Sequence, residues 1–197
     1  MEYIFGKQTG RLDRPALVSR LQGYSEVWID LGTGDGRYVE QLAKKNPDLF
    51  LIGIDACREN LSRVSGRAPS NALFLIANAE ALPSDLFGFA GRITVNFPWG
   101  SLLEGLLQKD SLVASNLRMI AGERANLEIR LNDTALCLAG LIPETGQARV
   151  VEVLERSGFE LKALQRLDGA ALRAFPSSWA RRVASGGKAL SLSLAAR

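Results

Sequence analysis

Short apolar runs alternate along the chain with stretches whose apolar residues recur at helical spacing. The apolar runs predict strands at 27–31, 50–54, 73–77, 93–97, 127–131, 161–167 and 189–194. The helical spacing predicts helices at 37–45, 58–64, 111–120 and 147–157. The early strands are nearly continuous apolar runs, which is typical of strands buried on both faces of a parallel sheet.

This alternation of strands and helices predicts an α/β, Rossmann-like fold. We expect a mostly parallel, seven-stranded sheet with helices on both faces and right-handed crossovers. The length of 197 residues suggests a single domain, 1–197, with a short N-terminal extension (about 1–25) and a basic C-terminal part (about 162–197). In such sheets, ligands bind beyond the carboxyl ends of the strands, and the motifs described next fall at those ends.

A glycine-rich loop, DLGTGDG at 30–36, follows the first predicted strand and opens a predicted helix. Its glycines allow a tight turn and a close approach of the backbone to a ligand. The spacing is not G-x-G-x-x-G and no Lys-Ser/Thr follows, which argues against a dinucleotide or a P-loop nucleotide. The carboxylate of Asp30 suits the cationic amino group of a ligand, whereas a pyrophosphate would be repelled by it.

Two further polar positions follow the second and third strands. Asp55 lies 19 residues after Gly36, and a carboxylate at this distance suits a ribose diol because it accepts from two hydroxyls. The segment 78–80, Asn-Ala-Glu, then lies at the rim of an adenine pocket. Together, the loop and these two positions match the amino acid, ribose and adenine parts of S-adenosylmethionine.

Two tryptophans in proline-containing segments are candidates for holding a nucleobase. Trp99 lies in NFPWG at 96–100, and Trp179 lies in FPSSWARR at 175–182. Two tryptophans on opposite sides of a pocket would clamp a base taken out of its stack. Stacking contributes ~1–3 kcal/mol per base, comparable to the unstacking cost. We expect Trp28, inside the first strand, in the core, and a core position is the alternative for the other two.

The residue types that are absent or isolated narrow the chemistry. The chain has no histidine, which removes Ser-His and Cys-His nucleophile pairs and histidine metal sites. Cys57 and Cys137 have no partner spacing, so we expect neither a disulfide framework nor a metal. The apolar runs are too short to span a bilayer, and the N-terminus lacks a signal-peptide core. We therefore expect a cytoplasmic protein.

The net charge of +3 is unevenly distributed. Residues 162–197 carry seven basic residues and one acidic residue, a balance of +6, and residues 1–161 carry −3. A basic part on a mildly acidic body suggests an anionic partner met on one side. A solvated polar face is the alternative that charge alone leaves open.

Five stretches of the chain, taken in order, resemble one known family. They are IDLGTGDGR (29–37), IGIDACRENL (52–61), NAEALP (78–83), FPWGSLLE (97–104) and SSWARR (177–182). In these stretches the chain resembles the aminoglycoside-resistance 16S rRNA methyltransferases of the Kam/Npm type, which modify N1 of adenine 1408. The glycine loop is shared by many methyltransferases, whereas FPWGSLL with the late tryptophan is specific to this family. The resemblance implies a class I methyltransferase fold, S-adenosylmethionine as cofactor, and 16S rRNA in the assembled 30S subunit as partner.

The resemblance also implies roles for individual residues. Those implied to hold the cofactor are Asp30, Gly32, Thr33, Gly34, Asp55, Ala79, Glu80, Ser101 and Ser177. Those implied to be catalytic are Phe97, Pro98, Trp99 and Trp179, the tryptophans stacking on a flipped adenine. Those implied to contact RNA are Arg63, Arg67, Arg181, Arg182 and Lys188. Relatives carry more basic residues after Arg182, and phosphate neutralisation dominates affinity for nucleic acid, so docking is expected to be weaker here.

The expected mechanism is a direct in-line transfer of methyl to adenine N1. Neutral adenine has a lone pair on N1, so no general base is needed, and catalysis comes mainly from proximity and orientation. NFPW at 96–99 also resembles the N-P-P-Y motif of enzymes that methylate the exocyclic amine, so N6 remains a variant that the neighbouring GSLLE disfavours. A methyltransferase of tRNA or of a small molecule and a non-catalytic ribosome-binding module are the alternatives. We expect a monomer.

Overall fold

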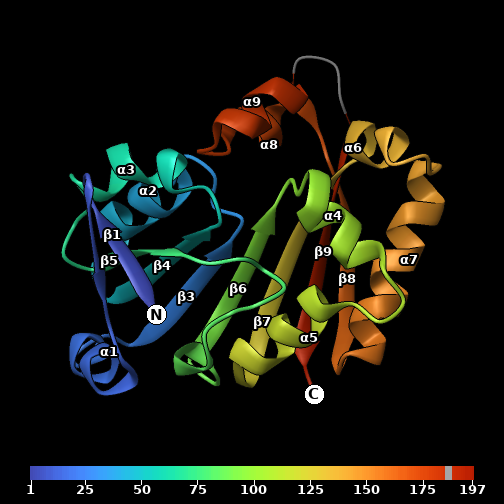
Figure 1. The fold of residues 1–197 in the computed structure, drawn as a ribbon. Coiled ribbons are helices and arrows are strands. Elements are labelled where there is room, and N and C mark those ends of the chain that lie inside the picture. The colour runs from blue at the N-terminus through green and yellow to red at the C-terminus, as the bar shows by residue number, and fades with distance from the viewer. Residues whose placement is uncertain (185–187) are drawn as a thin grey trace.

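The computed structural model describes residues 1–184 and 188–197, apart from the side chains of Ser178, Trp179 and Arg182. In the described residues, one nine-stranded sheet of order β2-β1-β5-β4-β3-β6-β7-β9-β8 is covered by helices on both faces (Figure 1). The predicted α/β fold is therefore confirmed. The prediction of seven mostly parallel strands is wrong, because the sheet is mixed and has nine strands.

The elements have the following bounds. The strands are β1 (Glu2–Phe5), β2 (Gln8–Arg11), β3 (Glu26–Leu31), β4 (Leu49–Asp55), β5 (Ala72–Ile76), β6 (Ala90–Asn96), β7 (Ala121–Asn132), β8 (Phe159–Leu167) and β9 (Ala189–Ala196). The helices are α1 (Arg14–Leu21), α2 (Arg37–Lys45), α3 (Arg58–Ser65), α4 (Gly100–Leu107), α5 (Leu112–Ile120), α6 (Asp133–Leu138), α7 (Pro143–Arg156), α8 (Gly169–Ala174) and α9 (Ser178–Ala184), with a 3-10 turn, η1 (Ser84–Leu86).

The five central strands, β5-β4-β3-β6-β7, run parallel to one another. Alternate side chains of these strands enter two different cores. Ile29 and Ile52 pack in the core that includes residues of α4, α5 and α7. Trp28, Leu51 and Phe74 pack on the other face with residues of α2 and α3. Burial on both faces explains why these strands are continuous apolar runs in the sequence.

The strands at the two edges are antiparallel to their neighbours. At one edge, β9 pairs with β7 and with β8. At the other edge, the β1–β2 hairpin pairs with β5, with Tyr3 opposite Leu75. The hairpin is missing from the prediction because each of its strands has four residues and β2, QTGR, has no apolar side chain. The seven predicted strands correspond to β3–β9.

Helices α8 and α9 lie beyond the carboxyl ends of the central strands (Figure 1). Leu172 of α8 and Ala180 of α9 pack with Phe97, which directly follows β6. This small core anchors the C-terminal helices above the sheet and closes one side of the site described below. Among the described residues, no helix is both long and apolar enough to cross a membrane.

Candidate active site

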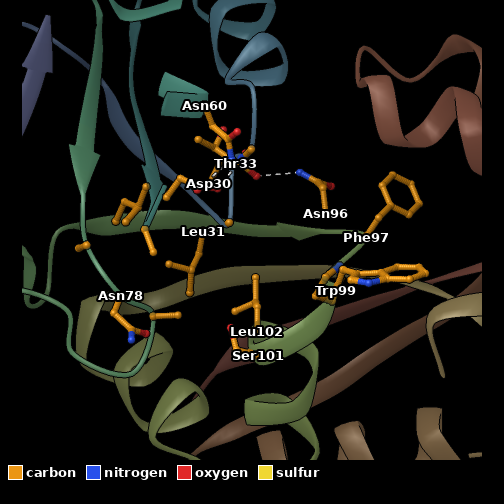
Figure 2. A pocket seen from close by; sticks show the side chains of 18 of the residues that line it. Asp30, Leu31, Thr33, Asn60, Asn78, Asn96, Phe97, Trp99, Ser101 and Leu102 are labelled. Atoms are coloured by element: carbon orange, nitrogen blue, oxygen red, sulfur yellow. Dashed lines mark hydrogen bonds between the residues drawn. The ribbon is translucent and has the colours of Figure 1, made fainter. Parts of the chain in front are cut away.

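A cavity of about 300 Å³ opens beyond the carboxyl ends of the parallel strands (Figure 2). Twelve residues singled out from the sequence line it: Asp30, Gly32, Thr33, Gly34, Asp55, Ala79, Glu80, Phe97, Pro98, Trp99, Ser101 and Ser177. Cavities of this size bind small molecules, and this edge of an open parallel sheet is where ligands bind. The structure therefore brings together the residues predicted for cofactor binding and three of those predicted for catalysis.

The glycine loop between β3 and α2 has a backbone that side chains would disturb. Gly32, Gly34 and Gly36 all have positive φ angles, of 72°, 57° and 67°. A Cβ on Gly32 would clash with Cδ2 of Leu102, and one on Gly36 would lie 2.5 Å from Cγ1 of Val64. A Cβ on Gly34 would meet nothing within 4 Å, because this residue faces the open cavity. The loop thus offers bare backbone to a ligand.

The Asp55 carboxylate is held in place by the same loop. Its Oδ2 accepts a hydrogen bond of 2.8 Å from the Gly34 N–H, and its Oδ1 accepts one of 2.9 Å from the Cys57 N–H. The amide of Asn60 adds a bond of 3.4 Å to Oδ1. Carboxylate oxygens have further lone pairs, so this pre-oriented group still has the capacity to accept from the two hydroxyls of a ribose.

The Asp30 carboxylate lies deep in the cavity. The residue is 3% exposed, and its Oδ1 accepts a hydrogen bond of 2.6 Å from Thr94 Oγ1. The same oxygen accepts one of 2.7 Å from Asn96 Nδ2 (Figure 2). Burial raises the pKa of Asp30 to about 6, although the Thr94 and Asn96 bonds oppose this rise. A carboxylate of this kind is stabilised by a cation, so it favours a positively charged ligand group.

The rim of the cavity opposite Asp30 is formed by the segment after β5. The Glu80 N–H donates a hydrogen bond of 2.9 Å to Asn78 Oδ1, and the carbonyl of Ala79 accepts one of 3.0 Å from Asn116. Leu102 also lines this side of the cavity (Figure 2). The carbonyl of Ala79 and the N–H of Glu80 are therefore both fixed by hydrogen bonds. This backbone and the apolar side chain of Leu102 form a surface that suits a flat heterocycle.

The aromatic end of the cavity follows β6. Phe97 is buried with a positive φ angle of 54°, which is uncommon for a residue with a side chain. Its N–H donates a hydrogen bond of 2.8 Å to the Arg130 carbonyl, and its ring contacts Phe175 edge to face. Pro98 and then Trp99, the residue preceding α4, follow this turn. Trp99 is 42% exposed and lines the cavity (Figure 2).

The second predicted aromatic, Trp179, belongs to α9, but its side chain lies outside the described part of the structure. The same holds for the side chain of Arg182. Ser177, directly before α9, lines the cavity. The backbone therefore places the SSWARR segment beside the site, and the contacts of Trp179 remain a prediction.

The other predicted RNA contacts are spread over two regions. Arg67 and Arg181 line a groove that shares Ser177 with the cavity. Arg63 on α3 and Lys188 before β9 are exposed but do not line this groove. Three basic residues that the sequence analysis did not select also line it: Arg37, Lys45 and Arg173. These residues come from α2 and α8, so their proximity depends on the fold.

One carboxylate in this groove already pairs with two of its neighbours. Glu40 Oε1 lies 2.7 Å from Lys44 Nζ, and Glu40 Oε2 lies 3.0 Å from Arg67 Nη2. These two partners hold the pKa of Glu40 below its usual value, against the effect of burial. The groove remains basic because Glu40 is outnumbered by the arginines and lysines around it.

The cavity is also lined by residues to which the sequence analysis assigned no role, among them Tyr38, Asn60, Asn96 and Leu102. Asn96 is the polar last residue of β6, which is the same signal that identified Asp55 at the end of β4. Tyr38 and Leu102 have no such signal, because they are apolar positions within α2 and α4 and resemble ordinary core residues. Among the described residues, no group of three or more acidic residues or cysteines could hold a metal ion.

The residues of the cavity fit S-adenosylmethionine. A buried carboxylate at Asp30 suits the ammonium group, and an oriented carboxylate at Asp55 suits the ribose diol. The glycine loop between them has room for a ligand at Gly34. Trp99 lies at the open end of the cavity, where a second substrate would enter (Figure 2).

Known proteins resemble this chain over its whole length. Residues 2–197 match the family model NpmA, 16S rRNA (adenine(1408)-N(1))-methyltransferase. A 16S rRNA (adenine(1408)-N(1))-methyltransferase from Escherichia coli is 33% identical, over 95% of this chain and 94% of that protein. The aminoglycoside resistance methyltransferase NpmB1 is 33% identical over 100% of this chain and 99% of its own, with a TM-score of 0.82. A variant of the corresponding enzyme of Catenulisporales acidiphilia, solved with cosubstrate SAM, is 25% identical over 100% and 96% of the two chains, with a TM-score of 0.86.

Proposed function

The chain belongs to the family of 16S rRNA (adenine(1408)-N(1))-methyltransferases, and from this premise we propose the reaction that it catalyses. It transfers the methyl group of S-adenosylmethionine to N1 of adenine 1408 in 16S rRNA, a modification that confers aminoglycoside resistance. The observation that carries this proposal is the single cavity that joins the buried Asp30 at one end to the exposed Trp99 at the other.

The residues of the cavity divide into a cofactor end and a base end. Asp30 pairs with the ammonium group, Asp55 accepts from the ribose hydroxyls, and Ala79 with Glu80 borders the adenine. The remaining cofactor residues are Gly32, Thr33, Gly34, Ser101 and Ser177, all of which line the cavity. S-adenosylmethionine supplies a methyl group on a positively charged sulfur, and the chain holds this group facing the base end.

At the base end, the chain positions the target adenine instead of activating it. Trp99, and Trp179 from α9, stack on the two faces of the flipped ring, while the backbone at Phe97 and Pro98 faces its edge. N1 carries a free lone pair, so fixed distance and alignment supply the rate enhancement without a general base. The methylated ring is positively charged, and a tryptophan face stabilises a cation.

The basic groove beside the cavity binds the phosphates that flank the target. Arg67 and Arg181 line this groove together with Arg37, Lys45 and Arg173, and Ser177 connects it to the cavity. RNA that enters the cavity with one base would therefore run over these side chains. Arg63, Arg182 and Lys188 extend the contact surface. The partner we propose is the assembled 30S subunit in the cytoplasm, met by a monomer.

The test is methyl transfer from labelled S-adenosylmethionine to purified 30S subunits, followed by primer extension through the decoding site. The expected result is a stop at adenine 1408 with the wild-type chain and no stop with Asp55→Ala. Calorimetry should show that Asp55→Ala has lost its affinity for the cofactor. Cofactor binding without a stop would refute the target, and the same assay with free 16S rRNA, tRNA and metabolites would then identify the acceptor.

A further inference from the structure

Arg130 on β7 reaches the cofactor end of the cavity through one side chain, Asn96. Its Nη1 donates a hydrogen bond of 2.6 Å to Asn96 Oδ1. The amide nitrogen of Asn96 in turn donates 2.7 Å to Asp30 Oδ1. The three residues lie on neighbouring parallel strands, with Asn96 directly opposite Arg130 in the β6–β7 register. A continuous chain of hydrogen bonds therefore runs from β7 to the cofactor carboxylate.

The chemistry of the two neighbours determines the orientation of the Asn96 amide. Arginine is a donor without acceptor atoms, so the atom facing Arg130 must be the amide oxygen. An ionised carboxylate only accepts, so the atom facing Asp30 must be the amide nitrogen. The opposite orientation would place N–H against N–H at Arg130. Asn96 is thus held in one orientation by partners on both sides.

Arg130 is itself fixed on three sides. Its Nη2 lies 2.5 Å from Glu128 Oε1, which also accepts a hydrogen bond of 2.9 Å from Ser191 on β9. Its guanidinium lies 4.6 Å from the centre of the Phe175 ring, and the side chain is 12% exposed. A long side chain held in this way delivers its donors to a constant position.

The backbone of Arg130 also supports the base end. Its carbonyl accepts the 2.8 Å hydrogen bond from the N–H of Phe97, the buried residue with the left-handed backbone. Pro98 and Trp99 follow this residue, so the position of the stacking face depends on the turn that Arg130 braces. Side chain and backbone of one residue therefore contact both ends of the site.

From these contacts we propose that Arg130 is a positioning residue of the methyl transfer, acting through Asn96. It orients Asn96 toward Asp30, so the carboxylate stays charged and aimed at the ammonium group. It also turns the amide oxygen of Asn96 toward β7 and away from an incoming base. The inference rests on the proposed function and adds two residues, Arg130 and Asn96, to the groups that act in it.

The orientation of Asn96 has a consequence for the atom that is methylated. The lone pair of the exocyclic amine of adenine is delocalised into the ring, so methylation at N6 needs an acceptor for the amine hydrogens. Arg130 holds the Asn96 oxygen on its own side, and the other polar atom of Asn96 is a donor that an amine cannot use. N1 needs no such acceptor, so this orientation of Asn96 favours N1 over N6.

Five charged or titratable groups on the surrounding elements act on Asp30 or share its cavity. Arg130 on β7 is the cation, and Tyr38 on α2 is a buried phenol whose pKa is raised, first by burial and then by the Asp30 charge. Asp35 in the loop, Asp55 at the end of β4 and Glu80 after β5 line the same cavity. Arg130 is thus the positive group that favours the ionised form of Asp30.

The experiment measures the affinity for S-adenosylmethionine by calorimetry from pH 5.5 to 8.5, together with turnover on 30S subunits at pH 8.5. In the wild type, affinity falls as the pH drops below about 6, where Asp30 takes up a proton. Arg130→Met removes the positive charge and should move this fall upward by about one pH unit, which makes binding roughly eightfold weaker at pH 5.5 and roughly threefold weaker at pH 6.5. Affinity at pH 8.5 stays within about threefold of the wild type, while turnover falls by about tenfold or more.

Two further variants separate positioning from a general loss of structure. Arg130→Lys keeps the charge but has one compact donor group in place of the planar fork. It should restore the pH dependence of binding without restoring turnover. Asn96→Leu breaks the connection at its centre, and the double variant with Arg130→Met should be no slower than the slower single variant. If Arg130→Met does not fold, the test uses the single variants Arg130→Lys and Asn96→Leu.

The matched control is Arg156→Met, which removes an exposed arginine that pairs with Glu152 on α7. It should match the wild type in both measurements. The proposal is overturned if Arg130→Met behaves like this control, or if it weakens cofactor binding equally at every pH. N6-methyladenosine among the nucleosides of the wild-type product would also overturn it. Failure of the proposed function is a separate result, a wild-type chain that binds cofactor and leaves adenine 1408 unmethylated.

Discussion

Phe175 stacks on Tyr38 with 4.8 Å between ring centres and 15° between ring planes. This contact joins the segment between α8 and α9 to the helix that follows the glycine loop. Phe175 also meets Phe97 edge to face at 5.6 Å and lies under the guanidinium of Arg130. One ring therefore aligns the C-terminal helices with both the cofactor loop and the turn at the base end.

Replacing Phe175 with alanine should uncouple these parts. The ring is partly buried, so we expect a loss of about 1–3 kcal/mol in the free energy of unfolding. Turnover on 30S subunits should fall by about tenfold or more, because α9 loses its alignment, while cofactor affinity changes by less than about threefold. Phe5→Ala, which removes a ring that is 60% exposed on β1, is the control and should change neither. Equal effects of the two variants would show that the Phe175 stack does not align the site.

Asp30→Asn should abolish cofactor binding and stabilise the free protein. Burial raises the pKa of Asp30 to about 6, above the value of about 3.9 in unfolded chains. The folded state therefore holds a proton that the unfolded state has lost, and stability decreases as the pH rises through this interval. Asparagine avoids that cost, which is up to about 3 kcal/mol for two pH units. Thermal unfolding should show that the variant is more stable than the wild type, by a margin that grows from pH 4 to pH 6 and is constant above pH 6.

The affinity of Asp30→Asn for the cofactor should change in the opposite direction to its stability. Calorimetry should show affinity for S-adenosylmethionine reduced by at least about 100-fold in Asp30→Asn, because the ammonium group loses its charged partner. Asp110→Asn, an exposed aspartate before α5, should match the wild type in affinity and stability. A variant of Asp30 that binds as tightly as the wild type would remove this residue from the site.

The sequence allowed the prediction that the residues proposed to bind the cofactor lie together, for a physical reason. Asp30 and Asp55 lie at the carboxyl ends of the buried strands β3 and β4, and 78–80 comes just after β5. Parallel strands bring their carboxyl ends to one edge. The position of each residue at the end of its strand was therefore enough to predict that the residues lie close together. The predicted bounds of α2 agree with the structure because its apolar residues, including Val39 and Ala43, are spaced for one buried face.

What the sequence could not supply is contact between distant segments. Arg130 lies 34 positions after Asn96 in a strand, and only the β6–β7 register brings the two together. The groove residues Lys45 and Arg173 come from α2 and α8, which are far apart in the sequence, so only the fold brings them together. The β1–β2 hairpin was missed because pairing with β5, and not an apolar pattern, makes these residues strands.

Trp99→Ala should reduce turnover strongly and leave the cofactor affinity unchanged. The side chain is 42% exposed, so its loss costs little stability, and it lies at the open end of the cavity, away from Asp30. Removal of one stacking face costs about 1–3 kcal/mol, which corresponds to about 5- to 150-fold in turnover per bound subunit. Trp99→Phe keeps a smaller face and should recover part of the rate. Lost cofactor binding in Trp99→Ala would contradict this division of roles.

Alanine at two glycines of the loop should separate backbone strain from steric conflict. Gly34 and Gly36 both have left-handed φ angles, so alanine costs about 1–2 kcal/mol at either position. At Gly36 the new Cβ also lies 2.5 Å from Val64 and 2.7 Å from Phe74, which adds a clash inside the core. Denaturant unfolding should therefore show a larger loss for Gly36→Ala. Gly34→Ala meets no protein atom, and its main effect should be weaker cofactor binding; equal stability of the two variants would contradict the clash.

Charge reversal in the groove should weaken RNA docking without affecting the cofactor. Lys45 and Arg173 line the groove, and neither has a role in the cavity. Lys45→Glu and Arg173→Glu should each reduce affinity for 30S subunits several-fold at low salt and lower the slope of log affinity against log salt, because fewer counterions are released. Filter binding at four salt concentrations measures this slope, and calorimetry should show unchanged affinity for S-adenosylmethionine. Lys162→Glu on β8 makes the same change of charge at the far edge of the sheet. If it weakens subunit binding as much as the groove variants, the effect is one of net charge, and the groove is not the contact surface.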